Sequence, residues 1–200
     1  DGVLSDVEMI FKKDLKVNSP IDVGFATGEF FPYNFGPELP AEQSLDDAKS
    51  LCFNGAILTR AKNIIGAPTV KLLISSNKPL AQLAVRLCDL RPNGTSALIS
   101  HGFINLTMNG SFENPRHLTV DQKFKVNLQL DQIAYFLPEG HRLRLAISNC
   151  YWPFVWPSPE IGTINIFSGK LVIPEMSENT IAEQYVFDDP ITGDLWNFEE

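Results

Sequence analysis

Few side chains in this sequence combine the residue types and spacing of a catalytic site. Ser100 and His101 are adjacent, but neighbouring residues on a strand point to opposite faces, so they cannot form the hydrogen bond of a nucleophile and its base. No G-x-S-x-G string, the turn that exposes a nucleophilic serine, occurs anywhere. His141 follows Gly140 at the start of a predicted strand, where a turn or edge hydrogen bond is expected. The chain is therefore predicted to carry no catalytic residue.

Metal and thiol chemistry are disfavoured by the same kind of argument. Cys52, Cys88 and Cys150 are isolated and odd in number, which favours buried, reduced thiols over a disulfide framework. No CxxC or HxxxH spacing is present, so no metal site and no cofactor are predicted.

A carboxylate pair, Asp46-Asp47, stands at the start of a possible short helix. Carboxylates are stabilised near the positive end of a helix dipole, so helix capping is the preferred interpretation. Calcium binding is the alternative, although the dense run of oxygen ligands typical of a calcium loop is missing.

The aromatic cluster Tyr151, Trp152, Phe154 and Trp156 is the most distinctive feature, and nearby prolines stiffen it. Large rigid rings suit an interface anchor or the wall of a substrate cleft, because they bury much area at low entropic cost. They equally suit a plug that closes the end of a β-sandwich, or a platform for stacking sugars. All three interpretations stay open from the sequence.

Composition narrows the class of protein. The 200 residues are 44% hydrophobic and 20% charged, enough for a sizeable core, and the net charge of -8 with a pI near 4.9 argues against nucleic acid. No stretch approaches the length of a membrane span, and the first residues lack the features of a signal peptide, so a cytoplasmic protein is predicted. The missing initiator Met suggests a piece of a longer chain.

Alternating apolar and polar residues predict strands between about residues 51 and 174. Residues 124–130 and 142–147 alternate strictly, as in a sheet with one dry face. Residues 80–87 fit both helical and strand spacing, but the turn signature Arg91-Pro92-Asn93-Gly94 favours a hairpin that joins residues 83–90 to 96–106. Residues 69–75 and 163–167 are further candidate strands. This pattern predicts an all-β sandwich or jelly roll with few short helices.

Three regions are predicted along the chain. Residues 1–44 are rich in Pro, Gly and aromatic residues and are expected to pack irregularly on the sandwich, which spans 45–175, with a C-terminal extension over 176–200. Short helices are expected at 45–50, behind a Ser44 cap, and at 178–184. The N-terminal segment is expected to bury its rings, namely Phe25, Phe30, Phe31, Tyr33 and Phe35.

Several segments, in order, resemble the C-terminal domain of the X-Pro dipeptidyl-peptidase and cocaine-esterase (CocE/NonD) family of serine hydrolases. Each motif is short, but together they cover more than half of the chain. Departures include Asn93 where the family usually has Asp, and the lack of the tryptophan-rich opening strand. The matching strings are DDAKSLCF (46–53), IGAPTVKL (65–72), VRLCDLRPNGTS (85–96), GFINLT (102–107), GHRLRLAIS (140–148), YWP (151–153) and WPSPE (156–160).

The resemblance implies a galactose-binding-like jelly roll that packs on an upstream α/β-hydrolase domain of the same polypeptide. That domain would supply the Ser, His and Asp of a catalytic triad, and the jelly roll would wall the cleft, stabilise the fold and contribute to a homo-oligomer. A free-standing carbohydrate- or ligand-binding jelly roll is the alternative.

Overall fold

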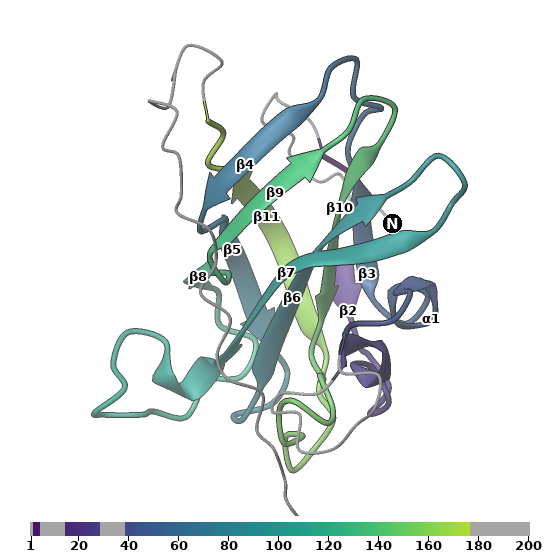
Figure 1. Ribbon diagram of the computed structural model, residues 1–200. Coiled ribbons are helices and arrows are strands. Elements are labelled where there is room, and N and C mark those ends of the chain that lie inside the picture. The colour runs from purple at the N-terminus through teal and green to yellow at the C-terminus, as the bar shows by residue number, and fades with distance from the viewer. Residues whose placement is uncertain (1, 5–14, 29–38, 177–200) are drawn as a thin grey trace, which may run out of the picture.

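The computed structural model describes residues 2–4, 15–28 and 39–176, and it confirms the all-β class. A five-stranded sheet and a four-stranded sheet pack face to face, and a two-stranded ribbon, β4–β9, lies at the upper left of the view in Figure 1. In sheet order the strands are β1 (Gly2–Val3), β3 (Leu51–Asn54), β10 (Arg142–Ser148), β6 (Gln82–Leu90) and β7 (Ser96–Asn105); then β2 (Leu15–Val17), β11 (Ile164–Val172), β5 (Thr69–Ser76) and β8 (Phe124–Gln129); then β4 (Lys62–Gly66) and β9 (Ile133–Leu137).

An apolar core fills the space between the two large sheets. On β8, Val126 and Leu128 are buried while the alternate residues are exposed, which confirms the period-two interpretation. The predicted strand at 163–167 is also found, although β11 continues to Val172. The buried side chains of this core come from both sheets and include Val70, Leu72, Ile74, Leu83, Val85, Leu87, Leu130, Leu145, Ile147, Ile164 and Ile166.

The ambiguous segment at 80–87 forms strand β6, and β6 pairs with β7 as the predicted antiparallel hairpin. Gly94 takes a φ of 88° in the connecting turn, and its N–H donates to the carbonyl of Arg91 at 2.9 Å. Eight of the nine β6 residues are buried, so both faces of the strand are covered. A strand buried on both faces loses its alternation, and this explains its ambiguous pattern.

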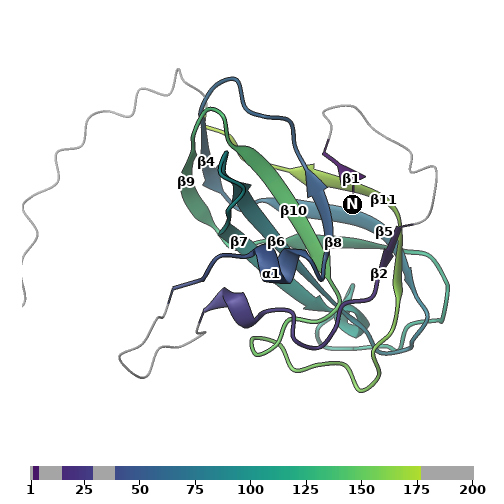
Figure 2. The same ribbon diagram turned by 90° about the vertical axis from the view of Figure 1, so that its right-hand side faces the viewer.

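The N-terminal segment supplies an edge strand to each sheet, because β1 pairs with β3 and β2 pairs with β11. The same segment crosses the outer face of the five-stranded sheet. The short helix α1 (Ser44–Asp47) lies in front of β6 in Figure 2, and the short helix η1 (Phe25–Thr27), in purple, lies below it. A third short helix, η2 (Leu106–Met108), follows β7. The outer face of β6 is therefore covered by chain rather than by solvent.

Two expectations for this segment were wrong. Phe25 is 65% exposed, because the turn that carries it is held by backbone and polar contacts and not by its ring. The helix begins at Ser44 instead of being capped by it, and the Ser44 hydroxyl donates to the carboxylate of Glu42. The other predicted rings and the predicted helix at 178–184 lie outside the described residues.

Within the described residues, no helix is long and apolar enough to cross a membrane. The described part of the C-terminal extension runs beside the ribbon, where Ile64 forms a β-bridge with Glu175.

Candidate functional site

The hydrogen bonds of Ser100 and His101 lead to two different atoms of one residue. The Ser100 hydroxyl donates to the carbonyl of Asp131 at 2.8 Å, and His101 Nδ1 lies 3.0 Å from Oδ2 of the same aspartate. These contacts join strand β7 to the segment after β8. Both side chains are thus held by Asp131 in a structural arrangement, and this pairing gives no nucleophile and base.

His141 forms the hydrogen bond that its position suggested, and its partner is a buried carboxylate. His141 Nδ1 lies 2.8 Å from Asp89 Oδ1, and the Tyr135 hydroxyl donates to Asp89 Oδ2 at 2.9 Å. Burial, followed by the bond to Asp89, raises the pKa of Tyr135 to about 12. Asp89 therefore links β9 and the start of β10 to β6. The sequence did not predict this role, because the partners of Asp89 are remote in sequence.

A buried polar layer covers the outer face of the five-stranded sheet, and Arg86 lies at its centre. Arg86 is 1% exposed, and its guanidinium donates to Gln43 Oε1 at 2.9 Å and to the Ser50 hydroxyl at 3.0 Å. The same group lies 3.0 Å from Asp47 Oδ1, and Arg144 Nη1 lies 2.9 Å from Asp47 Oδ2. One buried carboxylate thus pairs with two arginines and fixes the α1 region on the sheet.

The capping interpretation of the carboxylate pair was wrong. Asp46, which is 2% exposed, accepts hydrogen bonds from the N–H groups of Gly24 and Ala26 at 3.0 and 3.2 Å, so it holds the η1 turn instead of its own helix. Asp47 pairs with Arg86 and Arg144. Among the described residues, no group of three or more His, Cys, Asp or Glu side chains is placed to hold a metal ion.

Tyr151 closes this layer beside β7. Its side chain is buried, and its hydroxyl accepts a hydrogen bond from Thr27 at 2.6 Å. Its ring packs at 5.9–6.0 Å from His101, Phe103 and Phe154. Burial raises the pKa of Tyr151 and lowers that of His101, although Asp131 partly opposes the second effect. Tyr151 thus fits the plug interpretation, since it packs inside the domain.

Trp156 behaves in the opposite way, because it is 80% exposed at the far end of the same loop. Its ring meets Trp152 edge to face, with centroids 5.4 Å apart and planes at 78°. A backbone hydrogen bond attaches the loop to the N-terminal segment, since the N–H of Trp152 donates to the carbonyl of Val23 at 2.8 Å. At Gly24, whose φ is 116°, a Cβ would meet the carbonyl of Trp152 at 2.4 Å, so the two segments touch through their backbones.

The exposed or half-buried rings of the 151–156 loop and of its neighbours, β7 and the η1 turn, are called the aromatic surface. Ring contacts within it join Phe103 to Phe154 and Trp152 to Trp156, and Phe25 adjoins the loop through the backbone contact of Gly24 with Trp152. Phe25 and Phe103 are 65% and 40% exposed, and Trp152 and Phe154 are half-buried. The sequence identified the part of this surface on the 151–156 loop but missed Phe25 and Phe103, which other segments supply. The members of the aromatic surface are Phe25, Phe103, Trp152, Phe154 and Trp156.

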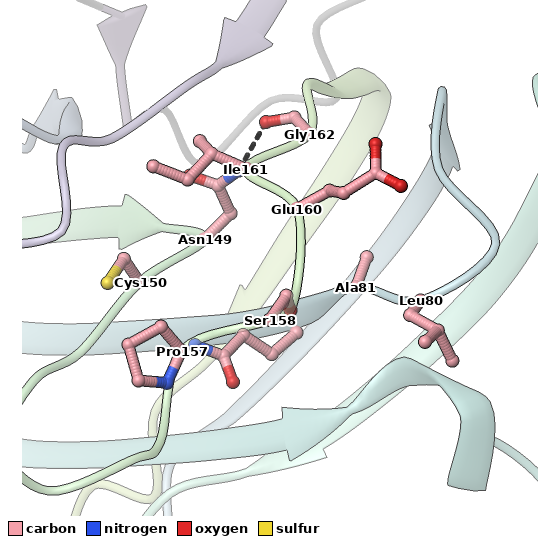
Figure 3. Close-up of a pocket in the computed structure, with 10 residues that line it drawn as sticks. Leu80, Ala81, Asn149, Cys150, Pro157, Ser158, Glu160, Ile161 and Gly162 are labelled. Atoms are coloured by element: carbon pink, nitrogen blue, oxygen red, sulfur yellow. Dashed lines mark hydrogen bonds between the residues drawn. The ribbon is translucent and has the colours of Figure 1, made fainter.

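A small cavity lies under the end of this loop, between the start of β6 and residues 149–162 (Figure 3). Its free volume of about 10 Å³ suits a single water molecule. Asn149 fixes the wall, since its side-chain amide donates to the carbonyl of Gly162 at 2.6 Å. A sugar ring does not fit this cavity.

The three cysteines are free and buried, as predicted. Burial raises the pKa of Cys52 to about 11 and that of Cys88 to about 12. Thiolates are the reactive form, so these environments suppress nucleophilic chemistry at both side chains.

This chain matches one protein family, one characterised relative and several solved structures. Residues 9–186 match the model of the X-Pro dipeptidyl-peptidase C-terminal non-catalytic domain. Cocaine esterase from Rhodococcus sp. (strain MB1 Bresler) is 24% identical over 147 residues, which are 70% of this chain and 25% of the esterase.

Two solved structures share the fold. An α-amino acid ester hydrolase superposes with a TM-score of 0.70 at 19% identity, over 82% of this chain and 32% of its own. An aminopeptidase from a marine sediment Thaumarchaeota archaeon superposes with a TM-score of 0.73 at 16% identity, over 88% of this chain and 35% of its own. The chain therefore spans about a quarter to a third of the length of these relatives.

Proposed function

Because the chain belongs to the family of X-Pro dipeptidyl-peptidase C-terminal non-catalytic domains, we propose that it is the accessory domain of a serine hydrolase. The hydrolase would cleave peptide or ester bonds with a Ser–His–Asp triad on an α/β-hydrolase domain outside these 200 residues. Relatives named as an esterase, an ester hydrolase and an aminopeptidase support this reaction class. Each is about three to four times longer than the part that matches, which leaves room for a catalytic domain.

The observation that carries the proposal is the aromatic surface. Trp156 and Phe25 are 80% and 65% exposed. The buried carboxylate of Asp46 holds the turn that carries Phe25, and backbone hydrogen bonds from Trp152 to Val23 and from Val155 to Tyr151 hold the loop that carries Trp156. Rigid exposed aromatic residues are the side chains that dominate protein interfaces, because little entropy is lost when they are buried. The aromatic surface would pack against the catalytic domain and form one wall of its substrate cleft.

The described polar groups support an accessory role. Asp89, Asp47 and Asp46 are each bonded to partners within the domain, and burial holds the pKa of the Cys52 and Cys88 thiols far above neutrality. Groups in such settings stabilise a fold instead of moving protons for a substrate. Catalysis would then depend on residues supplied by the hydrolase domain.

Carbohydrate binding, the alternative function, is less well supported by the same surface. Trp152 and Trp156 meet edge to face at 78°, so the two rings do not form one flat platform on which a sugar could stack. The cavity beneath has room for one water molecule. The homo-oligomer and the cytoplasmic location remain predictions.

The test begins in the cells that make this protein. A lysate is labelled with a serine-reactive phosphonate probe, and an antibody to this domain captures the polypeptide that contains it. A labelled band several times heavier than 22.3 kDa is expected. An unlabelled band near 22.3 kDa would show that the domain works alone and would overturn the proposal.

A further inference from the structure

The connection between β7 and β8 is long for a link between two strands. It covers residues 106–123, and η2 is its single regular element. In Figure 1 it projects as a teal loop at the lower left, away from the strands. Connections of this length without strands or longer helices are uncommon in compact domains and often bind ligands.

Hydrogen bonds hold this connection in a defined shape. The N–H of Arg116 donates to the carbonyl of Thr107 at 2.8 Å and closes the first half into a loop. The side chain of Asn109 donates to the carbonyl of Lys125 at 2.8 Å, which attaches that loop to β8. The N–H of Leu118 donates to Pro79 at 2.9 Å, and that of Asp121 donates to Ser76 at 2.7 Å. The two halves are therefore fixed relative to the sandwich.

Between the two halves lies a groove with a free volume of about 530 Å³, within the range of small-molecule sites. Its lining combines an apolar part with hydroxyl, amide and cationic groups. The lining residues are Leu106, Leu118 and Phe124; Thr107, Gly110, Ser111 and Thr119; Asn109, Asn114 and Gln122; and Arg116 and His117.

The charge of this lining contrasts with that of the chain. The protein carries a net charge of -8, but no Asp or Glu lines the groove. Arg116 is the permanent cation of the lining, and His117 lies beside it. Within the described part of the chain, neither side chain has an ion pair or hydrogen-bond partner, so the guanidinium is available to an incoming anion.

We propose that this groove binds a small organic carboxylate that carries an apolar group. A guanidinium pairs with a carboxylate through two parallel hydrogen bonds, and one such cation balances one negative charge. The neutral amides and hydroxyls supply further polar contacts, while the half-buried Leu118 and Phe124, backed by the buried Leu106, accept the apolar group. The proposal does not depend on the accessory role of the domain.

The experiment titrates the isotope-labelled chain by NMR with three probes, namely N-acetyl-leucine, its neutral amide and inorganic phosphate. N-acetyl-leucine is expected to give saturable amide shifts confined to residues 106–124, with a dissociation constant on the order of 1 mM. The neutral amide should bind at least about tenfold more weakly, because it lacks the charge-assisted hydrogen bonds. Phosphate, which lacks the apolar group, should also bind more weakly.

Matched variants separate the site from general attraction to arginine. Arg116→Gln should weaken binding of N-acetyl-leucine about tenfold, while Arg91→Gln, in the β6–β7 turn, should leave it unchanged. Equal shifts with the neutral amide, equal binding of phosphate, or unchanged binding by Arg116→Gln would each overturn the proposal. So would the absence of shifts at about 20 mM N-acetyl-leucine.

Discussion

The two faces of the five-stranded sheet are covered in different ways. Towards the four-stranded sheet, Leu83, Val85 and Leu87 of β6 enter an apolar core. Towards the N-terminal segment, Arg86 of the same strand is equally buried but rests among Gln43, Ser50 and Asp47. Apolar contacts are tolerant of small shifts, whereas charge pairs require particular partners at particular distances. The polar layer is therefore expected to specify where the N-terminal segment lies, and with it the exposed Phe25.

The largest expected effect comes from removing the centre of the polar layer. Arg86→Ala leaves Asp47 buried with one partner fewer, and breaking such a pair costs about 3–5 kcal/mol of stability. Urea unfolding followed by circular dichroism measures the loss. Arg91→Ala, on the exposed turn, is the control and should cost less than about 0.5 kcal/mol. A similarly small loss of stability for Arg86→Ala would mean that the polar layer contributes little to the free energy of unfolding.

The matching change in the apolar core is Leu87→Ala, one residue along the same strand. Leu87 is fully buried, so the expected cost is about 2–5 kcal/mol from lost burial and the cavity that remains. The same unfolding measurement applies, with Ile147→Val as a conservative control at about 1 kcal/mol. The sharper comparison is in the aromatic surface: Leu87→Ala should leave fluorescence of Trp152 and Trp156 native-like, whereas Arg86→Ala should change it.

A smaller effect is expected at the bond between Thr27 and Tyr151. Thr27→Val keeps the shape but removes the donor to the buried phenol, at a cost of about 1–3 kcal/mol. Tyr151→Phe instead leaves the Thr27 hydroxyl without its acceptor. In a double-mutant cycle the combined variant should lose less than the sum of the two single changes. Strict additivity would contradict a direct interaction between these side chains.

Alkaline pH provides a test without mutation. Burial raises the pKa of Cys52 from 9.0 to about 11, that of Cys88 from 9.0 to about 12, and that of Tyr135 from 10.0 to about 12. A raised pKa in the folded state means that the unfolded chain loses its protons first. Stability from these groups is therefore complete below about pH 9 and falls as the pH rises towards 12. Urea midpoints should stay level between about pH 8 and 9 and decline between about pH 9 and 11, and a flat profile over the whole range would contradict the assigned environments.

The sequence predicted the apolar side of the molecule well and the polar side poorly. Alternation along β8 and the Arg91–Gly94 turn identified strands and a hairpin, because period-two burial and a positive φ at Gly94 depend on local residues. Asp46 and Asp47 were misinterpreted because their partners, Gly24, Ala26, Arg86 and Arg144, are remote in sequence. No local pattern indicates such pairings.

The aromatic surface shows the same limit. The aromatic residues of the 151–156 loop were identified from their residue types. The sequence did not predict that Tyr151 is buried while Trp156 is exposed, because this difference depends on contacts of Tyr151 with Thr27 and β7, which are remote in sequence. Phe25 was expected inside because a phenylalanine is usually buried, and the buried carboxylate of Asp46 instead holds its turn at the surface.

The central claim is that the aromatic surface packs on a catalytic domain, and oxidative footprinting tests it most directly. The 200-residue chain and the longer polypeptide proposed to contain it are exposed to hydroxyl radicals, and oxidation is read by mass spectrometry. Trp156, 80% exposed in this domain, should be oxidised in the chain and protected in the longer polypeptide, while Phe136, 61% exposed on β9, should react equally in both. Equal oxidation of Trp156 in the two samples would contradict the account.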